Sequence, residues 1–328
     1  MRQLRVHKEK WPVRGVFAIS RGSRTEIEVV VAEVVEGDCR GRGEGHPYTR
    51  YHETLDGVAA ELEKLSAEVA GGIDCESLQE VLPAGAARNA LDCALWDLRA
   101  RQEGVPVWKL AGIREAPAPA LSAFTLSVDR PEAMAARARE HAGKTLLKVK
   151  LAGEGDLERM RAVREAAPKA RLIVDANEAW TEELYRKLVP ELAAMRVELV
   201  EQPLPAGKDA CLRGLERPVP LGADESCHDR SSLPGLEGLY DFINIKLDKT
   251  GGLTEAVRLA ATARERGFRI MVGCMLGTSL AMAPATLLSG YAEFVDLDGP
   301  LLLAKDRENG LRFEECRIQP PGRALWGY

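Results

Sequence analysis

The sequence lacks a long apolar run, and it carries no large excess of charge of either sign. No hydrophobic stretch approaches the length of a membrane-spanning helix, and the first residues, MRQLRVHKEKWPVRG, contain no apolar core of a secretory signal. The formal net charge is −5 over 328 residues, and lysines and arginines form no block. We therefore expect no membrane partner, no nucleic-acid partner and a cytoplasmic protein.

Cysteine and glycine patterns exclude further classes. The seven cysteines are odd in number and include no Cys-x-x-Cys pair. Neither a zinc site nor a disulfide framework is predicted, in agreement with a reducing compartment. No Gly-x-Gly-x-x-Gly follows an early strand, which disfavours a dinucleotide-binding, doubly wound sheet.

From residue 120 onward, short apolar segments alternate with segments of helical spacing. Thr181 is a candidate N-cap of one such helix, and Pro190 is expected to bend that helix or end it early. Strand–helix alternation predicts a parallel sheet, and eight strands in about 180 residues fit a closed barrel better than an open doubly wound sheet. The predicted strands are 121–127, 146–151, 171–177, 197–203, 219–225, 241–247, 269–274 and 293–298.

The two ends of the chain follow another pattern. Residues 25–44 predict an antiparallel hairpin turning at 37–38, and residues 85–104 predict one amphipathic helix. The tail holds a second hairpin signal, Asn309-Gly310. We predict an α+β capping domain over 1–117, a barrel over 118–300 and a tail, 301–328, that returns to the cap.

Acidic residues follow the apolar core of three consecutive predicted strands. Asp175 ends RLIVD, Glu201 ends VELVE, and Asp224 lies in LGADE. The carboxyl ends of the strands form the active site of a βα barrel, so these side chains can converge. Three carboxylates repel one another unless a cation neutralises them, and all-oxygen ligation selects a hard ion such as Mg²⁺. The alternative is that each acid caps the following helix or forms an isolated salt bridge. The occurrence of all three acids at equivalent strand ends disfavours it.

Three lysines accompany these acids. Lys148 and Lys150 lie on one face of the strand before Asp175, and Lys246 ends the strand INIK. We expect the pair at the barrel rim and Lys246 on the opposite side, unless the pair is merely solvent-facing. A neighbouring cation lowers the pKa of a lysine, so both sides offer a base. A metal that stabilises an enediolate between two opposed bases predicts racemisation or epimerisation.

The motifs KVK, VDAN, VEQPLP, ADES and NIKLDKTGG resemble the muconate-lactonising subgroup of the enolase superfamily. The resemblance covers nearly the whole chain and implies a capping domain on a modified (β/α)7β barrel, a TIM-like fold. It implies Mg²⁺ on the three acids, Lys150 and Lys246 as the two acid/bases, and Lys148 as a residue that tunes Lys150. Asn177 and Glu225 would support the ligands. This subgroup is often oligomeric, so a homo-oligomer is compatible with the resemblance.

The resemblance also implies a substrate class. Asp296 and Asp298 in VDLDGP resemble the Asp-x-Asp by which dipeptide epimerases hold the ammonium group of a dipeptide. Arg21 and Arg24, in ISRGSRTE, lie in the loop that covers the substrate side chain in such enzymes, and Arg24 is favoured as its contact. An arginine there suits an acidic side chain. Further predicted pocket residues are Thr125, Cys274 and Met275.

Together these features predict epimerisation of L-Ala-D/L-Glu, a dipeptide released from murein peptide. The alternatives are other dipeptides, or the reactions of o-succinylbenzoate synthases and muconate cycloisomerases, which have no ammonium to bind. A barrel that only binds a dipeptide or a protein is disfavoured, because it has no use for three metal acids beside opposed lysines. Cys274 as a nucleophile and a catalytic histidine dyad are disfavoured as well.

Overall fold

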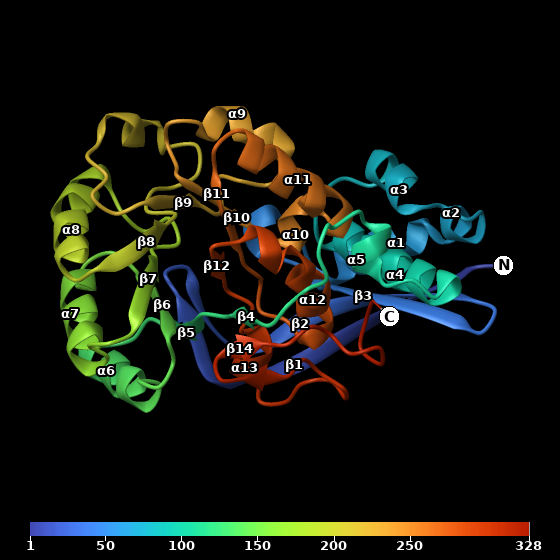
Figure 1. The fold of residues 1–328 in the computed structure, drawn as a ribbon, viewed down its shortest axis with the longest axis horizontal. Helices are drawn as coiled ribbons and strands as arrows, with labels where there is room; N and C mark the ends of the chain where they lie inside the picture. Colours follow the sequence, from blue (N-terminus) through green and yellow to red (C-terminus); the bar gives the residue numbers. More distant parts are fainter. Residues whose placement is uncertain (328) are drawn as a thin grey trace.

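The computed structural model, which describes residues 1–327, combines an antiparallel three-stranded sheet with an eight-stranded parallel sheet (Figure 1). The parallel sheet curls until its two edges meet, where Ser122 and Val295 form a parallel bridge and Ala123 N donates to Val295 O at 2.7 Å. The predicted barrel and the predicted antiparallel cap are both confirmed.

The antiparallel sheet comes from the first 45 residues. Strands β1 (Gln3–Ile19) and β2 (Gly22–Glu36) form a long hairpin, and β3 (Cys39–Gly45) pairs with β2 across the predicted turn. Strand β1 was not predicted, because Pro12 interrupts its pattern and a register shift lies between Pro12 and Phe17. In Figure 1 the far end of this hairpin reaches strands β5 and β6.

Five helices follow these strands, and α4 (Ala86–Glu103) is the central one. The predicted inward residues Ala87, Leu91, Ala94 and Leu98 are all buried. Burial extends round the other faces of α4 too, because β3 packs on one side and the barrel lies on another. The remaining helices of this part are α1 (Leu55–Lys64), α2 (Ser66–Ala70), α3 (Cys75–Val81) and α5 (Val107–Leu110).

The barrel strands occur in chain order around the sheet, from β5 to β12. All eight fall inside the predicted segments. Their bounds are β5 (Phe124–Leu126), β6 (Leu146–Lys150), β7 (Arg171–Asp175), β8 (Val197–Glu201), β9 (Leu221–Ala223), β10 (Phe242–Ile245), β11 (Arg269–Val272) and β12 (Phe294–Val295).

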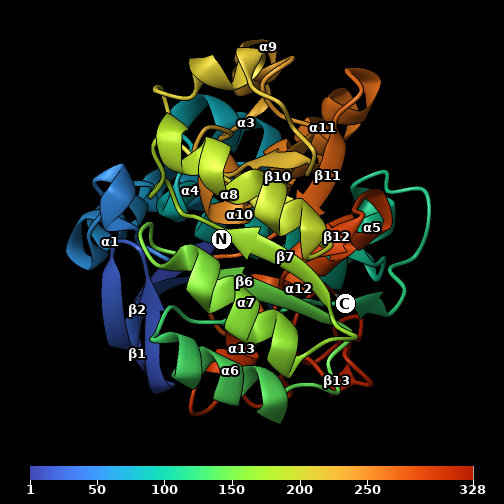
Figure 2. The same cartoon turned by 90° about the vertical axis from the view of Figure 1, so that its left-hand side faces the viewer.

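Helices cover the outside of the barrel, and Figure 2 shows α6 (Pro131–Glu140), α7 (Asp156–Ala166) and α8 (Glu182–Ala194) side by side over β6 and β7. Thr181 caps α8 by accepting from Leu184 N, as predicted. Pro190 does not end α8, which continues to Ala194. The other helices are α9 (Leu233–Leu236), α10 (Leu247–Thr250), α11 (Leu253–Glu265), α12 (Ser279–Ala285) and α13 (Gly299–Leu302), with 3₁₀ turns at Thr49–Tyr51, Ala210–Gly214, Arg230–Ser232 and Thr286–Tyr291.

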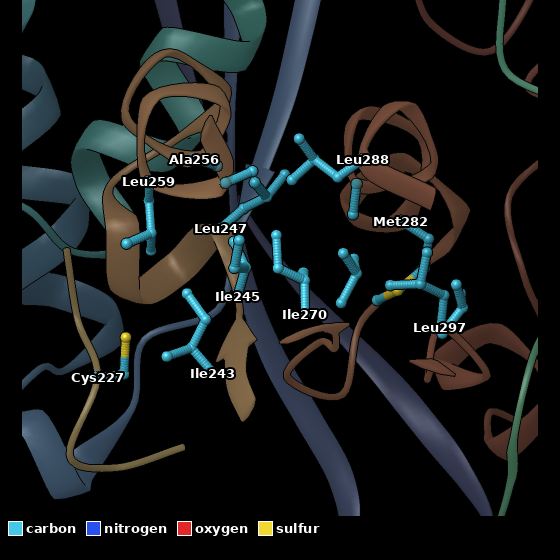
Figure 3. Packing of buried hydrophobic residues seen from close by; sticks show 14 of the residues in the cluster. Cys227, Ile243, Ile245, Leu247, Ala256, Leu259, Ile270, Met282, Leu288 and Leu297 are labelled. Atoms are coloured by element: carbon cyan, nitrogen blue, oxygen red, sulfur yellow. The ribbon is translucent and has the colours of Figure 1, made fainter. Parts of the chain in front are cut away.

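Side chains alternate between the two faces of the barrel strands. Ile243 and Ile245 of β10 point outward and pack with Leu259 of α11 in the main core (Figure 3). The intervening residues point inward, where six of the eight strands, together with the residue before β5, each supply one member of an apolar layer. That layer consists of Ala123, just before β5, with Leu146, Ile173, Leu199, Phe242, Met271 and Phe294.

The tail differs from the prediction in one respect. Asn309 and Gly310 form a turn, with Gly310 N donating to Arg307 O at 3.2 Å, but they do not join two paired strands. The tail hairpin pairs β13 (Phe313–Glu314) with β14 (Arg317–Ile318), and β14 also pairs with β4 (Ala120–Leu121). The chain then reaches α4, where Trp326 Nε1 donates to Cys93 O.

Within residues 1–327, no helix combines the length and the apolar character that crossing a bilayer demands.

Candidate active site

A layer of buried polar side chains lies above the apolar layer inside the barrel. Each member follows an apolar member by two residues on its strand, so the two layers are separated by about 6.6 Å along the strands. The polar layer therefore lies toward the carboxyl ends of the strands. Its members are Thr125, Lys148, Asp175, Glu201, Asn244 and Asp296.

Three carboxylates converge at this end of the barrel. Asp175, Glu201 and Asp224 each place one oxygen within 4.8 Å of the others, and all three are buried. Burial alone would raise the pKa of Asp175, but the charges of Lys150 and Lys148 lower it to about 2. Burial and the neighbouring Asp175 raise the pKa of Glu201 to about 7. Buried oxygen ligands with uncompensated negative charge fit a hard divalent cation such as Mg²⁺.

Two lysines approach the carboxylates from opposite sides of the barrel. Lys150 Nζ lies 2.5 Å from Asp175 Oδ2, and Lys246 Nζ lies 2.6 Å from Asp224 Oδ2. Three strands separate β6 from β10 in either direction around the closed sheet. Burial alone would lower the pKa of Lys246, but the charges of Asp224 and Glu201 outweigh it and raise that pKa well above its usual value. This direction is opposite to the predicted lowering, because the acids contribute more at Lys246 than the cationic Lys148 does.

Lys148 lies deeper than predicted. Its Nζ is 2.6 Å from Glu201 Oε2, 2.7 Å from Asp296 Oδ2 and 3.4 Å from Asp175 Oδ2. The prediction placed Lys148 and Lys150 together at the rim of the barrel. Residues i and i+2 of a strand do share a face, but Lys148 lies two residues farther from the carboxyl end of β6 and therefore deeper in the barrel. Lys148 is thus a buried counter-charge for three acids, and their charges outweigh burial and raise its pKa.

Asn177 and Glu225, both predicted as supports, lie beside Asp175. Asn177 donates its backbone N to Asp175 Oδ1 at 2.8 Å and its Nδ2 to Asp175 Oδ2 at 3.1 Å. Its left-handed backbone, with φ of 43°, makes this double contact possible. Glu225 is buried, and burial, followed by the charges of Asp224 and Asp175, raises its pKa.

Three supporting residues were not predicted. Asn244 Nδ2 donates to Glu201 Oε1 at 2.6 Å, Lys249 Nζ lies 2.6 Å from Asp224 Oδ1, and Gln202 Oε1 accepts from Asp224 N at 2.9 Å. The rule that i and i+2 share a face would have found Asn244, two residues before Lys246. Lys249 and Gln202 follow their strands, where sequence periodicity says nothing about direction.

The hairpin tip and the 3₁₀ turn at Thr49–Tyr51 cover a small cavity above the lysines. The cavity measures about 60 Å³, and both Lys150 and Lys246 line it. Of the other predicted residues, Arg21, Arg24, Asn177, Asp224, Glu225, Cys274 and Met275 line it too. His46, Tyr48 and Tyr51 also line it and were not predicted.

The two arginines of the tip have different surroundings. Arg21 forms ion pairs with Glu225 at 2.7 Å and with Glu178 at 3.1 Å. Arg24 contacts His46 Nε2 at 3.3 Å and forms no ion pair with any carboxylate of residues 1–327. Burial, followed by the charge of Arg24, lowers the pKa of His46 to about 3, so the imidazole is neutral and can accept this hydrogen bond.

The predicted ammonium pair lies beside the cavity rather than on its lining. Asp296 accepts from Lys148, and Asp298 Oδ2 accepts from Thr125 N at 2.6 Å. Burial and the charge of Asp296 raise the pKa of Asp298 to about 7. The geometry therefore brings Thr125 and Asp298 together, while one oxygen of Asp296 has no hydrogen-bond partner.

Known proteins share this architecture along the whole chain. Residues 1–112 match the family described as mandelate racemase / muconate lactonizing enzyme, N-terminal domain, and residues 132–324 match the enolase C-terminal domain-like family. An enolase family member from Agrobacterium tumefaciens, with homology to dipeptide epimerases and with bound sodium and L-Ala-L-Glu, superposes with a TM-score of 0.98 at 49% identity over 100% of both chains.

Named relatives include epimerases and a racemase. The chain is 49% identical to L-Ala-D/L-Glu epimerase of Escherichia coli K12, over 95% of this chain and 98% of that protein. It is 44% identical to N-acetyl-D-glutamate racemase of a Pseudoalteromonas species, over 91% and 95%. Dipeptide epimerase from Methylococcus capsulatus, complexed with Mg and L-Arg-D-Lys, is 32% identical over 98% of both chains with a TM-score of 0.89. The chain belongs to the mandelate racemase / muconate lactonizing enzyme family of the enolase superfamily.

Proposed function

We propose that this protein is a Mg²⁺-dependent epimerase that interconverts L-Ala-L-Glu and L-Ala-D-Glu. One observation carries the proposal: two buried lysines, Lys150 and Lys246, face each other across a cluster of three carboxylates. Inverting a carbon requires a proton to leave one face and another to arrive on the opposite face. Two opposed amines beside a cation site suit that requirement.

Asp175, Glu201 and Asp224 are the residues that would hold the ion. When bound there, Mg²⁺ supplies positive charge that stabilises a carboxylate as the proton next to it departs. Asn177, Asn244 and Lys249 hold the three acids through direct hydrogen bonds, so the ligand oxygens are oriented beforehand.

Lys150 and Lys246 would serve as the two acid/bases. For one diastereomer, one lysine takes the glutamyl α-proton, and the carbon becomes planar as the enediolate forms. The other lysine then donates a proton to the opposite face, and the roles reverse for the other diastereomer. Lys148 forms ion pairs with three acids. We therefore propose that it neutralises part of their negative charge and does not transfer a proton.

Substrate recognition is assigned to two groups of residues. Asp296 and Asp298 are proposed to hold the ammonium of the alanine, since two adjacent carboxylates offer more negative charge than Lys148 neutralises. Arg24 is proposed to bind the glutamyl side chain, because it lines the cavity and has no carboxylate partner among the described residues. A bidentate guanidinium–carboxylate pair would complete its hydrogen bonding.

A second candidate is racemisation of N-acetylglutamate. The 44% identical racemase from Pseudoalteromonas supports it, and both substrates would present the same glutamyl group to Arg24 and the lysines. They differ at the carbon next to the acyl carbonyl, which bears an ammonium group in L-Ala-L-Glu and is a plain methyl group in N-acetylglutamate. The Asp296–Asp298 pair favours the ammonium, since buried carboxylates gain nothing from a methyl group.

Proton NMR in D₂O tests the proposal. L-Ala-L-Glu and N-acetyl-L-glutamate are incubated separately with the protein, once with Mg²⁺ and once with EDTA. Loss of the glutamyl α-proton and appearance of L-Ala-D-Glu, only with Mg²⁺, is the expected result. Faster exchange of N-acetylglutamate would favour the second candidate, and no exchange of either would remove the glutamyl assignment.

We also propose a cytoplasmic location for the protein. All seven cysteines are unpaired, which is typical of a reducing cytoplasm. L-Ala-D-Glu is a fragment of murein peptide, so we propose a role in the degradation of that peptide. Assembly into a homo-oligomer is compatible with the family and is measurable by light scattering.

A further inference from the structure

The tip of the β1–β2 hairpin is bound to the barrel through side chains. Arg21 Nη2 lies 2.7 Å from Glu225 Oε1, while its Nη1 lies 3.1 Å from Glu178 Oε2 and donates to Asn177 O at 3.0 Å. Ser20 Oγ donates to the same carbonyl at 2.9 Å. One arginine thus joins the tip to the loops that follow β7 and β9.

Both acids are held in place to receive this arginine, Glu178 by one barrel amide and by Arg50 from the neighbouring turn of the cap. Glu178 has a left-handed backbone, with φ of 68°, and its carboxylate also accepts from Arg50 Nε and Nη2 and from Ala206 N, each at 2.9 Å. Glu225 has a side chain only 2% exposed, and its Oε2 has no hydrogen-bond partner. Arg21 is the one described residue that forms an ion pair with Glu225.

The receiving loops also carry the carboxylates of the candidate metal site. Asn177 Nδ2 contacts Glu225 Oε1 at 3.4 Å and Asp175 Oδ2 at 3.1 Å. Asp224 directly precedes Glu225 in the chain. The position of the hairpin tip is therefore connected to the orientation of two acids below it.

We propose that Arg21 is a positioning residue that latches the hairpin over the site, whereas Arg24 alone contacts the substrate side chain. This division rests on the proposed function for Arg24, but the latch itself rests on the contacts of Arg21. Arg21 contacts two carboxylates and a backbone carbonyl of the barrel. Among the described residues, Arg24 contacts His46 of the cap and no barrel carboxylate.

Opening and closing of the hairpin must accompany substrate binding. The cavity of about 60 Å³ is far smaller than the roughly 300 Å³ or more that a ligand pocket usually needs. A dipeptide can enter only if the tip moves away, and the return of Arg21 to Glu225 and Glu178 closes the site again. Loss of the latch should therefore weaken binding of every substrate equally, whatever its side chain.

Hydrogen exchange measures the latch without using substrate. We compare Arg21→Gln, Arg21→Lys and the control Arg14→Gln, which alters an exposed arginine of the same hairpin. We expect Arg21→Gln to raise the exchange rate of amides in residues 17–24 about tenfold, as expected for loss of local closure, with an intermediate value for Arg21→Lys. Unchanged exchange in Arg21→Gln would overturn the proposal.

Kinetics separate latching from recognition. Values of kcat/KM are compared for L-Ala-L-Glu and its neutral analogue L-Ala-L-Gln. Arg21→Gln should lower both by the same factor, about tenfold or more and mainly through KM, because closure holds any substrate. Arg24→Gln should lower only the value for L-Ala-L-Glu. A changed Glu/Gln ratio in Arg21→Gln would assign Arg21 to the substrate and overturn the division.

A variant of the receiving side serves if Arg21→Gln fails to fold. Glu178→Gln removes the negative charge that Arg21 shares with Arg50, without touching the three metal acids, and it should raise exchange in residues 17–24 in the same direction. Wild-type exchange in Glu178→Gln would contradict the latch. If the protein epimerises neither dipeptide, the proposed function fails, yet exchange still decides whether Arg21 latches the tip.

Discussion

At the scale of single residues, each acid of the site is held by a group of opposite charge or by a hydrogen-bond donor. Asp224 lies between two lysines, with Lys246 on Oδ2 and Lys249 on Oδ1. Glu201 lies between Lys148 and Asn244. Burial of so many charges is tolerable only because each has a partner, so changes to single members should have large effects.

The two proposed acid/bases give the first prediction. Lys150→Ala and Lys246→Ala should each lower the rate of epimerisation by about 10³-fold or more, because one face of the carbon then has no proton carrier. Each variant should still exchange the α-proton of one diastereomer with D₂O, and the two variants should differ in which one. NMR of both diastereomers measures this. Equal loss of all exchange in both variants would contradict the two-base assignment.

The ammonium pair gives the second prediction. Asp298→Asn should raise KM for L-Ala-L-Glu by about tenfold or more, since a buried charge pair with the substrate is lost. Affinity for Mg²⁺, measured by calorimetry, should change little because Asp298 contacts Thr125 and none of the three acids. An unchanged KM would exclude Asp298 as an anchor, and a matching loss of Mg²⁺ affinity would indicate a general disturbance of the site.

Lys249 gives the third prediction. Lys249→Met leaves Asp224 with one cation fewer, so the free energy of unfolding in EDTA should fall by about 3–5 kcal/mol. Because a bound cation can replace the missing charge, Mg²⁺ should stabilise this variant more than it stabilises the wild type. Urea unfolding with EDTA and with Mg²⁺ measures both effects. Lys187→Met, on the exposed face of α8, is the control and should behave as wild type.

At the scale of elements, strand β3 and helix α4 determine how the cap is built. Every second residue in the second half of β3 is glycine, at 41, 43 and 45, and a Cβ at any of them would collide with the α4 backbone. The strand therefore lies flat against the helix, closer than side chains would permit. This spacing of two is visible in the sequence, yet it becomes meaningful only once α4 is known to lie against β3.

Gly43 gives the fourth prediction. Gly43→Ala should lower the free energy of unfolding by about 3 kcal/mol, because the new methyl group would overlap Ala90 O and force β3 away from α4. Chemical unfolding monitored by circular dichroism measures the change. The matched control is Gly290→Ala, where an added Cβ meets no atom within 4 Å. Equal stability of the two variants would show that β3 can shift away from α4 without a loss of stability.

At the scale of the whole molecule, the tail binds the cap to the barrel. Arg307 lies 2.6 Å from Glu9 Oε2 on β1 and 2.8 Å from Glu44 Oε2 on β3. Its Nε donates to Thr278 Oγ1 at 2.7 Å, at the start of α12. Since this guanidinium joins three parts of the chain, we expect cap and barrel to unfold together.

Arg307 gives the fifth prediction. Arg307→Met should lower the free energy of unfolding by about 3–5 kcal/mol, since the buried Glu44 loses its counter-charge. The unfolding curves of the cap and the barrel, followed by hydrogen exchange of each part, should also separate. Arg312→Met removes an exposed arginine nearby and should leave both curves superimposed. A single transition in Arg307→Met would show that other contacts suffice to couple the two parts.

Some of the site could be predicted and some could not. Asp175, Glu201 and Lys246 stand at strand ends, where strand periodicity fixes which face a side chain takes. Lys148 was placed on the correct face but at the wrong depth. Gln202, with φ of 35°, and Lys249, on α10, follow their strands, and only the folded loops decide where such side chains point.

The sequence by itself determined the eight strands, the direction of their side chains and the three acids with two opposed lysines. These follow from local rules, because alternation along a strand and the order of strands in a parallel barrel need no knowledge of distant contacts. The tertiary structure alone decided that Arg21 pairs with barrel acids while Arg24 does not. It also decided that residues 3–19 form strand β1 within the predicted cap and that the tail pairs with β4 through β14. The ion pairs of Arg21 and the pairing of β14 with β4 join segments far apart in the chain, whose meeting no local pattern encodes. The register shift after Pro12 hid β1 from a pattern of simple alternation.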